Sequence, residues 1–535
     1  MTATFQTFLL LIAVLAATAT FARKFSITPA ILLLITGIAL AFVPGLPAVT
    51  LAPEIVLLML LPPLIYSAGV SMSWREFKSN LRPIGMLAIG CVVFTTCAVA
   101  AAAHWWLGLP WAVGFLLGAI VSPPDVVAPL AIARRLKMPR RILVILEGEG
   151  LANDATALIL YRFAVITITT GAFSLTKATG TFGAIVVCEL AYGIGVGWLS
   201  LRLRQWARDP RIEITLSLLT PYLAYWVPEH LGGSGVLATV AAGIYVSWNG
   251  PLLISSATRL QGVFFWDLVI WLIEGSLFLL IGFQMRLLLE KTNAIPVNEA
   301  LIAIALVSAI VIAARFAWVF PATYIPRWLS KRIATSDPAP SWRATFVVGF
   351  TGIRGAVSLA AALAIPLTLP GGEAFPHRDL ILFVTFGVIF VTLVGLGLTL
   401  PFVVKLLGLN RHGHTEEFEE REREIAARRD IIGFGRVHLD GMIANRALSE
   451  SLAGFLNARH NTRVLALPEP PKEQGQFTSS TLGAPLVREI ISAERKRLHE
   501  LLRDGQITDE TRRRIERDLD LEEAVVDNRE KNGPI

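Results

Sequence analysis

The chain has 535 residues, of which 54% are hydrophobic and 17% are charged. Soluble domains carry about 25% charged residues, so this composition excludes an ordinary soluble protein. Residues 1–410 contain 27 Lys and Arg against 17 Asp and Glu, and residues 411–535 contain 21 against 24. The net charge of +7 is therefore +10 in the apolar part and −3 in the tail. Basic loops between apolar segments indicate membrane orientation and exclude a nucleic-acid partner.

Thirteen segments are apolar enough to cross a bilayer, which takes about 20 residues per helix. We predict an all-α polytopic membrane protein with a transmembrane domain over 1–408. The thirteen predicted spans are 5–21, 27–43, 51–70, 82–103, 112–133, 142–169, 180–201, 212–227, 233–249, 262–284, 300–324, 343–366 and 379–404.

The charges of the connecting loops predict the orientation of these spans. Alternate loops carry 19 Lys and Arg on one side and 4 on the other. Basic loops face the cytoplasm, so the amino terminus is expected outside and the carboxyl terminus inside. The first span is read as a retained helix and not as a signal peptide, because its basic residues, Arg23 and Lys24, follow the apolar run.

The tail, residues 409–535, is predicted to be a charged helical cytoplasmic domain. Its elements are an exposed helix over 415–430, a proline-rich linker at 468–471 and two amphipathic helices over 484–504 and 509–527. It contains no nucleotide, phosphate or metal motif. A structural or regulatory appendage is expected, with no cofactor and no enzymatic activity.

Ionisable side chains within the predicted spans are costly and mark candidate sites. They are Asp125, Glu147, Glu149, Asp154, Arg162, Glu189, Asp267, Glu274, Arg315 and Arg354.

The fifth span contains Pro123, Pro124 and Asp125 in succession. Two prolines remove two backbone donors and disfavour helix before each of them. We therefore predict a broken helix at mid-membrane with free carbonyls beside a carboxylate. Such backbone occurs only where it is buried in protein or lines a cavity. Asp125 is expected to cap the second half-helix, to line the site, or both.

The sixth span carries Glu149, Asn153 and Asp154. Glu149 and Asn153 are four residues apart and share a helix face, while Asp154 lies about 100° further round. A carboxylate near the midplane is neutralised either by a proton or by a cation. Competition between the two would itself be an exchange mechanism, and the alternative is a structural Asp bonded to neighbouring helices.

The twelfth span has glycines at 349, 352 and 355 around Arg354. The glycines weaken the helix, and an arginine that stays charged needs a buried carboxylate partner. Spans 5 and 12 are each fifth within a block of six, spans 1–6 and 8–13. Interrupted helices at matching positions indicate inverted repeats with the site at their crossing.

These segments together resemble the monovalent cation:proton antiporters, the family of bacterial NhaP proteins and animal sodium/proton exchangers. The likeness covers about residues 10–405. It rests on the Leu-Leu-Pro-Pro run from Leu60, the Glu-x-x-x-Asn-Asp pattern from Glu149 to Asp154, the stretch from Gly233 to Ala238, and Gly-x-Arg-Gly-Ala around Arg354.

The resemblance implies that Asp154 binds the cation and the proton and that Asn153 supports it. It also implies that Glu149 pairs with Arg354, that the two broken helices cross beside the site, and that the protein is a homodimer. Family members often have Thr-Asp-Pro where this chain has Pro124-Asp125-Val126. The hydroxyl is absent here, so the carbonyl of Pro124 would stand beside Asp125.

The expected substrate is Na⁺ at Asp154 and Asp125, with K⁺ or Li⁺ as alternatives, exchanged for H⁺ without net charge movement. The charged tail resembles those of bacterial members and implies a bacterial inner membrane. A cation channel is disfavoured because no filter-like loop is found. An intramembrane aspartyl protease using Asp125 and Asp154 is disfavoured, because Pro-Pro-Asp and Asn-Asp do not resemble the motifs of that chemistry, and peptide cleavage would identify it. A sodium-driven symporter is the third alternative, and counter-flow of protons would separate it from exchange.

Overall fold

We describe a computed structural model of the chain. It describes residues 2–25, 27–44, 46, 52–171, 175–291, 296–369, 371–445, 449–465, 484–503 and 509–531. The chain forms two compact units, Met1–His414 and Thr415–Ile535. The described elements are helices, apart from one isolated antiparallel bridge between Thr368 and Ala374. The prediction of an all-α protein is thereby confirmed for the described residues.

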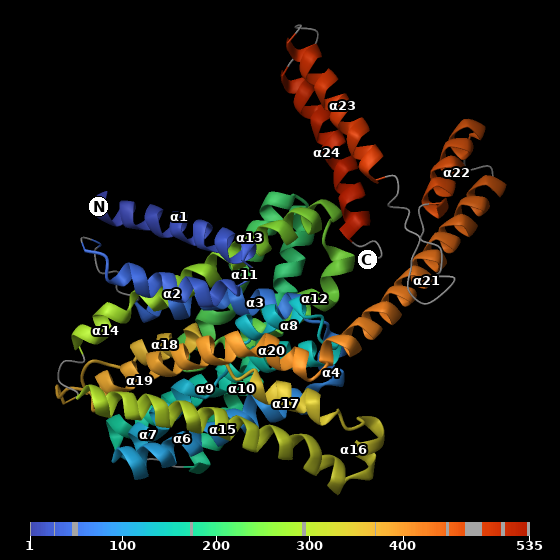
Figure 1. Cartoon of the computed structure of the whole chain (residues 1–535). Helices are drawn as coiled ribbons and strands as arrows, with labels where there is room; N and C mark the ends of the chain where they lie inside the picture. The colour runs from blue at the N-terminus through green and yellow to red at the C-terminus, as the bar shows by residue number, and fades with distance from the viewer. Residues whose placement is uncertain are drawn as a thin grey trace. The chain divides into compact units, whose positions relative to one another are not determined.

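Figure 1 shows the helices of the first unit gathered in one bundle. In chain order they are α1 (Thr2–Lys24), α2 (Pro29–Ala41), η1 (Ile55–Leu60), α3 (Leu61–Ser71), α4 (Trp74–Ser79), α5 (Leu81–Gly85), η2 (Met86–Cys91), α6 (Val92–Leu107), α7 (Trp111–Val121), α8 (Val127–Arg135), α9 (Arg140–Thr170), α10 (Leu175–Ala207), α11 (Pro210–His230), α12 (Val236–Leu253), α13 (Ser256–Phe283), α14 (Met285–Lys291), α15 (Val297–Leu329), α16 (Lys331–Ser336), α17 (Trp342–Phe350), α18 (Ala356–Leu363), α19 (Arg378–Phe390), η4 (Val391–Leu396) and α20 (Gly397–Leu406).

Each of the thirteen predicted spans falls on one of these helices or on consecutive ones. Six helical stretches among the described residues are long and apolar enough to cross a membrane by themselves: Leu81–Leu107, Arg140–Thr170, Ala178–Ala207, Ala257–Leu289, Asn298–Leu329 and Arg378–Leu406. The count of thirteen stays a prediction, because several of the other elements are short or broken.

Two predicted spans are interrupted as expected. The fifth consists of α7 and α8, separated by residues 122–126, and the twelfth consists of α17 and α18, separated by residues 351–355. The first break contains the two prolines, which have no N–H to continue a helix. The second contains Gly352 and Gly355, where the absence of a side chain lowers the helix propensity.

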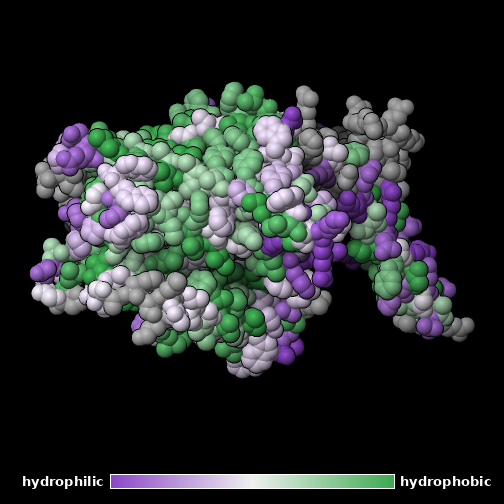
Figure 2. Space-filling view, turned by 90° about the horizontal axis from the view of Figure 1, so that it is seen from below, coloured by the Kyte–Doolittle hydropathy of each residue, from purple (hydrophilic) through white to green (hydrophobic). Residues whose placement is uncertain are grey.

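Helices elsewhere in the unit pack closely through glycine. A side-chain carbon at Gly37 of α2 would lie 2.2 Å from the carbonyl oxygen of Leu279 in α13, and one at Gly282 would lie 2.2 Å from that of Leu34. Such close backbone contact is typical of helices packed in lipid. Figure 2 shows apolar side chains over much of the visible face of this unit. Exposed ones include Leu260, Val263, Phe264 and Trp328.

The second unit contains α22 (Glu450–Leu465), α23 (Ala484–Arg503), α24 (Asp509–Lys531) and the later part of α21 (Leu409–Ala444). Helices α23 and α24 lie side by side (Figure 1) and bury Ile491, Leu498 and Leu519 between them. Arg495 bridges to α24 through Asp520 and Glu523. The two predicted amphipathic helices are therefore present, and the predicted proline-rich linker at 468–471 lies outside the described residues.

Candidate cation-binding site

The two helix breaks meet directly. The backbone N–H of Asp125, in the first break, donates to the carbonyl oxygen of Ile353, in the second break, at 2.7 Å. Buried backbone groups need such partners, because water is absent to supply them. This bond fixes one broken helix against the other, so the residues of both breaks belong to a single site.

Arg354 occupies the crossing and satisfies the carbonyls that the breaks leave free. Its Nε donates to the oxygen of Val121 at 2.8 Å and its Nη2 to that of Ser122 at 3.1 Å, while Nη1 donates to the oxygen of Gly352. The first two oxygens end α7, and the third follows α17. A cation is favourable at helix carboxyl termini. The positive charge of the guanidinium group therefore stabilises the carboxyl ends of α7 and α17, the first halves of the two broken helices.

Asp125 lies at the amino ends of the second half-helices, α8 and α18. Its Oδ1 accepts from the backbone N–H of Val127 at 3.0 Å, at the start of α8. A side-chain carbon at Gly355, the residue before α18, would lie 2.2 Å from Oδ2 of Asp125. Only glycine allows the carboxylate so close to that helix end. Asp125 thus both caps a half-helix and lines the site, the two roles that the sequence left compatible.

Helix α9 presents Asn153 and Asp154 to the first break. The Nδ2 of Asn153 donates to the carbonyl oxygen of Pro124 at 2.7 Å, and its Oδ1 accepts from the backbone N–H of Asp154 at 2.7 Å. Asn153 is fully buried and holds α9 against the break. The Pro124 oxygen keeps a second lone pair. Within the described part of the chain, the carboxylate of Asp154 accepts no hydrogen bond and has no ion pair.

Asp125 and Asp154 open onto one cavity of about 320 Å³. Pro124 and Gly355 also line it, so the cavity begins at the helix crossing. Its charged lining side chains are Asp125, Asp154, Glu147, Glu274 and Arg134, four acidic and one basic. Carboxylate and carbonyl oxygens are the ligands that hard cations prefer, and this lining provides them beside a negative local charge.

The predicted partner of Glu149 is wrong. Glu149 pairs with Arg315 of α15, whose Nη1 lies 2.5 Å from Oε1 and whose Nη2 lies 2.8 Å from Oε2. Their side chains are 0% and 1% exposed, so both charges are fully desolvated. Arg354 instead donates to the carbonyl oxygens that the breaks leave free, those of Val121, Ser122 and Gly352.

The sequence assigned no role to three of the charged residues in the predicted spans, Arg315, Glu147 and Glu274. The structure places Glu147 in an ion pair with Arg134 at 2.7 Å, at the rim of the cavity. Glu274 comes from α13, far from the signature segments in sequence, and reaches the same cavity. In the sequence, all three stand out as charged residues within apolar segments. Such a position indicates a candidate site, but it does not identify the residue with which each side chain interacts.

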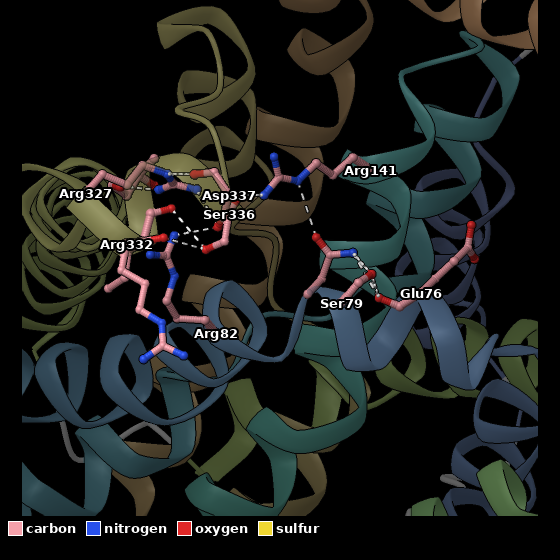
Figure 3. Close-up of polar contacts among 11 residues, drawn as sticks. Glu76, Ser79, Arg82, Arg141, Arg327, Arg332, Ser336 and Asp337 are labelled. Atoms are coloured by element: carbon pink, nitrogen blue, oxygen red, sulfur yellow. Dashed lines mark hydrogen bonds and ion pairs between the residues drawn. The ribbon is translucent and has the colours of Figure 1, made fainter. Parts of the chain in front are cut away.

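A second polar cluster joins helix ends away from the cavity (Figure 3). Arg82 of α5, Arg141 of α9 and Arg327 of α15 all donate to the carboxylate of Asp337, which follows α16; the bond from Arg82 measures 2.6 Å and that from Arg327 2.9 Å. Asp337 thereby ties α9, which carries Asp154, to α15, which carries Arg315. We call these four residues the Asp337 cluster.

The charges of the cluster determine the ionisation of Asp337. Partial burial acts to raise the pKa of its carboxyl group, but the hydrogen bonds and charges of Arg141 and Arg327 outweigh it and hold the pKa below its ordinary value. Asp337 is therefore ionised throughout the neutral range.

The sequence matches the family model described as "Sodium/hydrogen exchanger, transmembrane" over residues 10–406. An uncharacterized Na⁺/H⁺ exchanger of Mycobacterium tuberculosis is 36% identical over 389 residues, 72% of this chain and 71% of the relative. The low-affinity Na⁺/H⁺ antiporter NhaS1 of Synechocystis is 32% identical over 78% of this chain and 77% of its own. A "sodium, potassium, lithium and rubidium/H⁺ antiporter" of Bacillus subtilis is 34% identical over 66% of this chain and 54% of its own.

The fold is also that of a solved antiporter structure. The sodium/proton antiporter MjNhaP1 of Methanocaldococcus jannaschii matches with a TM-score of 0.56 and 19% identity, over 75% of this chain and 97% of that one. The family match and the relatives identify a multi-pass membrane transporter of the cation/proton antiporter class, and not an enzyme. The chain belongs to the sodium/hydrogen exchanger family.

The buried Glu149–Arg315 pair predicts strong energetic coupling. Glu149→Gln and Arg315→Leu should each lower the melting temperature in detergent, because each strands a buried charge at a cost of about 3–5 kcal/mol. The double variant should lose less than the sum of the single losses. The more exposed pair of Glu76 and Arg140 is the control, with coupling of about 1 kcal/mol or less. Additive losses at Glu149 and Arg315 would show that the two charges do not interact.

The Asp337 cluster predicts a pH-dependent stability difference between wild type and Asp337→Asn. Because the pKa of Asp337 is lower in the folded state, its carboxylate contributes stability that is complete above the unfolded-state pKa of about 4 and is lost as the pH falls through the folded-state value. The variant should melt below wild type at pH 7, and the gap should close on acidification below pH 4. A gap that is absent at pH 7, or equal at both pH values, would contradict this.

Proposed function

We propose that the chain exchanges a monovalent cation for H⁺ across the membrane, with Asp154 as the shared cation and proton site. The observation that carries the proposal is the position of Asp154. Its carboxylate, which has no ion pair among the described residues, lines a cavity at the crossing of two broken helices. Na⁺ is the first choice of cation, because several relatives are named as Na⁺/H⁺ antiporters, and K⁺ and Li⁺ are the alternatives.

In this mechanism proton and cation compete for one carboxylate. When Asp154 is protonated it is neutral and has no charge to hold a cation; when it is ionised, a cation replaces the proton. Asp125 and the second lone pair of the Pro124 oxygen lie beside it as further cation ligands. Asn153 acts as a positioning residue, because its amide links Pro124 to the backbone of Asp154.

Transport would proceed by alternating access to this site from the two sides of the membrane, as is general for transporters with crossing broken helices. A single carboxylate that carries either one cation or one proton moves no net charge per cycle. Exchange is therefore proposed to be electroneutral.

The proposed setting is a homodimer in a bacterial inner membrane, surrounded by lipid, with the amino terminus outside. The charged tail, residues 409–535, would then lie in the cytoplasm. In that setting, exchange of cytoplasmic Na⁺ for external H⁺ would serve pH homeostasis.

Asp154→Asn should abolish cation-dependent proton flux in proteoliposomes while the protein still inserts and folds. The substitution removes the negative charge at nearly constant volume, so neither proton nor cation would be carried. A collapsing proton gradient on addition of Na⁺, K⁺ or Li⁺ is the measurement, and protons moving with the cation would indicate symport.

Asp154→Glu and Glu76→Gln are the matched controls for this variant. The first keeps the charge and should retain weak exchange. The second removes a carboxylate that does not line the cavity and should leave exchange unchanged. Flux near the wild-type rate in well-folded Asp154→Asn would place the transporting carboxylate elsewhere, with Asp125 as the next candidate.

Electroneutral exchange predicts insensitivity to membrane voltage. A potential imposed with K⁺ and valinomycin, at a fixed pH gradient, should leave the rate of Na⁺/H⁺ exchange unchanged. Voltage acts at about 2.3 kcal/mol per moved charge per 100 mV, so movement of even one net charge would change the rate several-fold. A strong voltage effect would mean that a second titratable group joins the cycle.

A further inference from the structure

The cavity at Asp154 has a wall that does not belong to the broken helices or to α9. Helix α13 forms part of this wall through Ile270, Glu274, Leu277 and Phe278. Among these four, only Glu274 is ionisable. Its carboxylate has no hydrogen bond and no ion pair within the residues that the structure describes, although it lies among apolar neighbours. A half-buried carboxylate without a partner is costly to maintain, which indicates a function.

We propose that Glu274 determines the apparent affinity for the cation on one side of the membrane only, the side towards which the cavity extends. It would attract the cation into the cavity before the cation reaches Asp154. This inference rests on the proposed function, because it assumes that a cation moves through this cavity.

The extent of the cavity identifies that side. From the crossing, its lining follows α8 through Val127, Leu130 and Ala131 to Arg134, and it follows α9 only over the first half, from Glu147 to Asp154. Arg134 is exposed at the end of α8. The cavity therefore runs towards the basic loops, the end that the loop charges place in the cytoplasm.

The negative charge of Glu274 would attract the cation at this position. Of the other charges that line the cavity, Asp125 repels the Glu274 carboxylate and Arg134 attracts it. Arg134 is already engaged by Glu147, so the attraction of a passing cation to Glu274 is not cancelled. The attraction between two opposite unit charges about 8 Å apart, at an effective dielectric constant of about 40, raises the affinity for the cation roughly five-fold.

The restriction to one side follows from alternating access. When the site turns to the opposite side, this cavity must close, and a cation arriving from there meets Asp154 without passing α13. Glu274 would then contribute to cation capture in one state only. A carboxylate that bound the cation as Asp154 does would instead affect both sides equally.

The test is Glu274→Gln in the full-length chain, assayed in inside-out and right-side-out membrane vesicles with Na⁺ as the probe. With Na⁺ on the cytoplasmic side, the apparent KM should rise about three- to ten-fold and kcat should stay within about two-fold of wild type. With Na⁺ on the opposite side, both constants should be unchanged. Because Glu274 has no described partner, the substitution strands no charge.

Two further variants make the result specific. Glu274→Asp keeps the charge and should restore most of the affinity. Glu76→Gln removes a carboxylate that pairs with Arg140, at the start of α9, and that does not line the cavity, and it should leave the KM unchanged. Raising the ionic strength with choline chloride should narrow the difference between wild type and Glu274→Gln, because salt screens the attraction.

Three results would overturn the inference: a KM equal to wild type on both sides, an equal rise on both sides, or a fall in kcat with unchanged KM. Failure of the proposed function is distinguishable from these. It would show as wild-type vesicles without cation-dependent proton flux, or as exchange that survives in Asp154→Asn, whatever Glu274→Gln does.

Discussion

Backbone groups that leave a helix within an apolar bundle must find partners, and this constraint organises the centre of the molecule. The breaks at residues 122–126 and 351–355 create two carboxyl ends and two amino ends at one place. Arg354 donates to carbonyls at both carboxyl ends, and Asp125 lies against both amino ends. One cation and one anion therefore stabilise four half-helix ends.

This arrangement explains why Asp154 differs from its charged neighbours. The carboxylate of Asp125 lies against the helix amino ends, and Arg354 donates to the freed carbonyls. Glu149 is paired with Arg315. Asn153 links the break to α9 without a charge of its own. Among these groups Asp154 alone retains an unused charge that faces the cavity. The Asp337 cluster, at the ends of α9 and α15, holds the two helices that carry Asp154 and Arg315 in register with each other.

The sequence allowed the helical class, both breaks and the residues of the crossing to be predicted, because each depends on local chemistry. Two prolines before Asp125 and the glycines around Arg354 disrupt a helix wherever it packs. The partner of Glu149 depends instead on which helix lies beside α9. Arg315 is 166 residues away, and no local pattern relates the two. The role of Glu274 was hidden for the same reason, since only packing brings α13 to the cavity.

The central claim is that a proton and a cation exclude each other at Asp154. Proton release on cation binding tests it most directly, with purified protein in weakly buffered detergent solution and a pH indicator. Addition of Na⁺ near the pH at which the site is half protonated should release up to one proton per chain, and Asp154→Asn should release none. Absence of release from wild type across pH 5 to 9, or equal release from Asp154→Asn, would contradict the account.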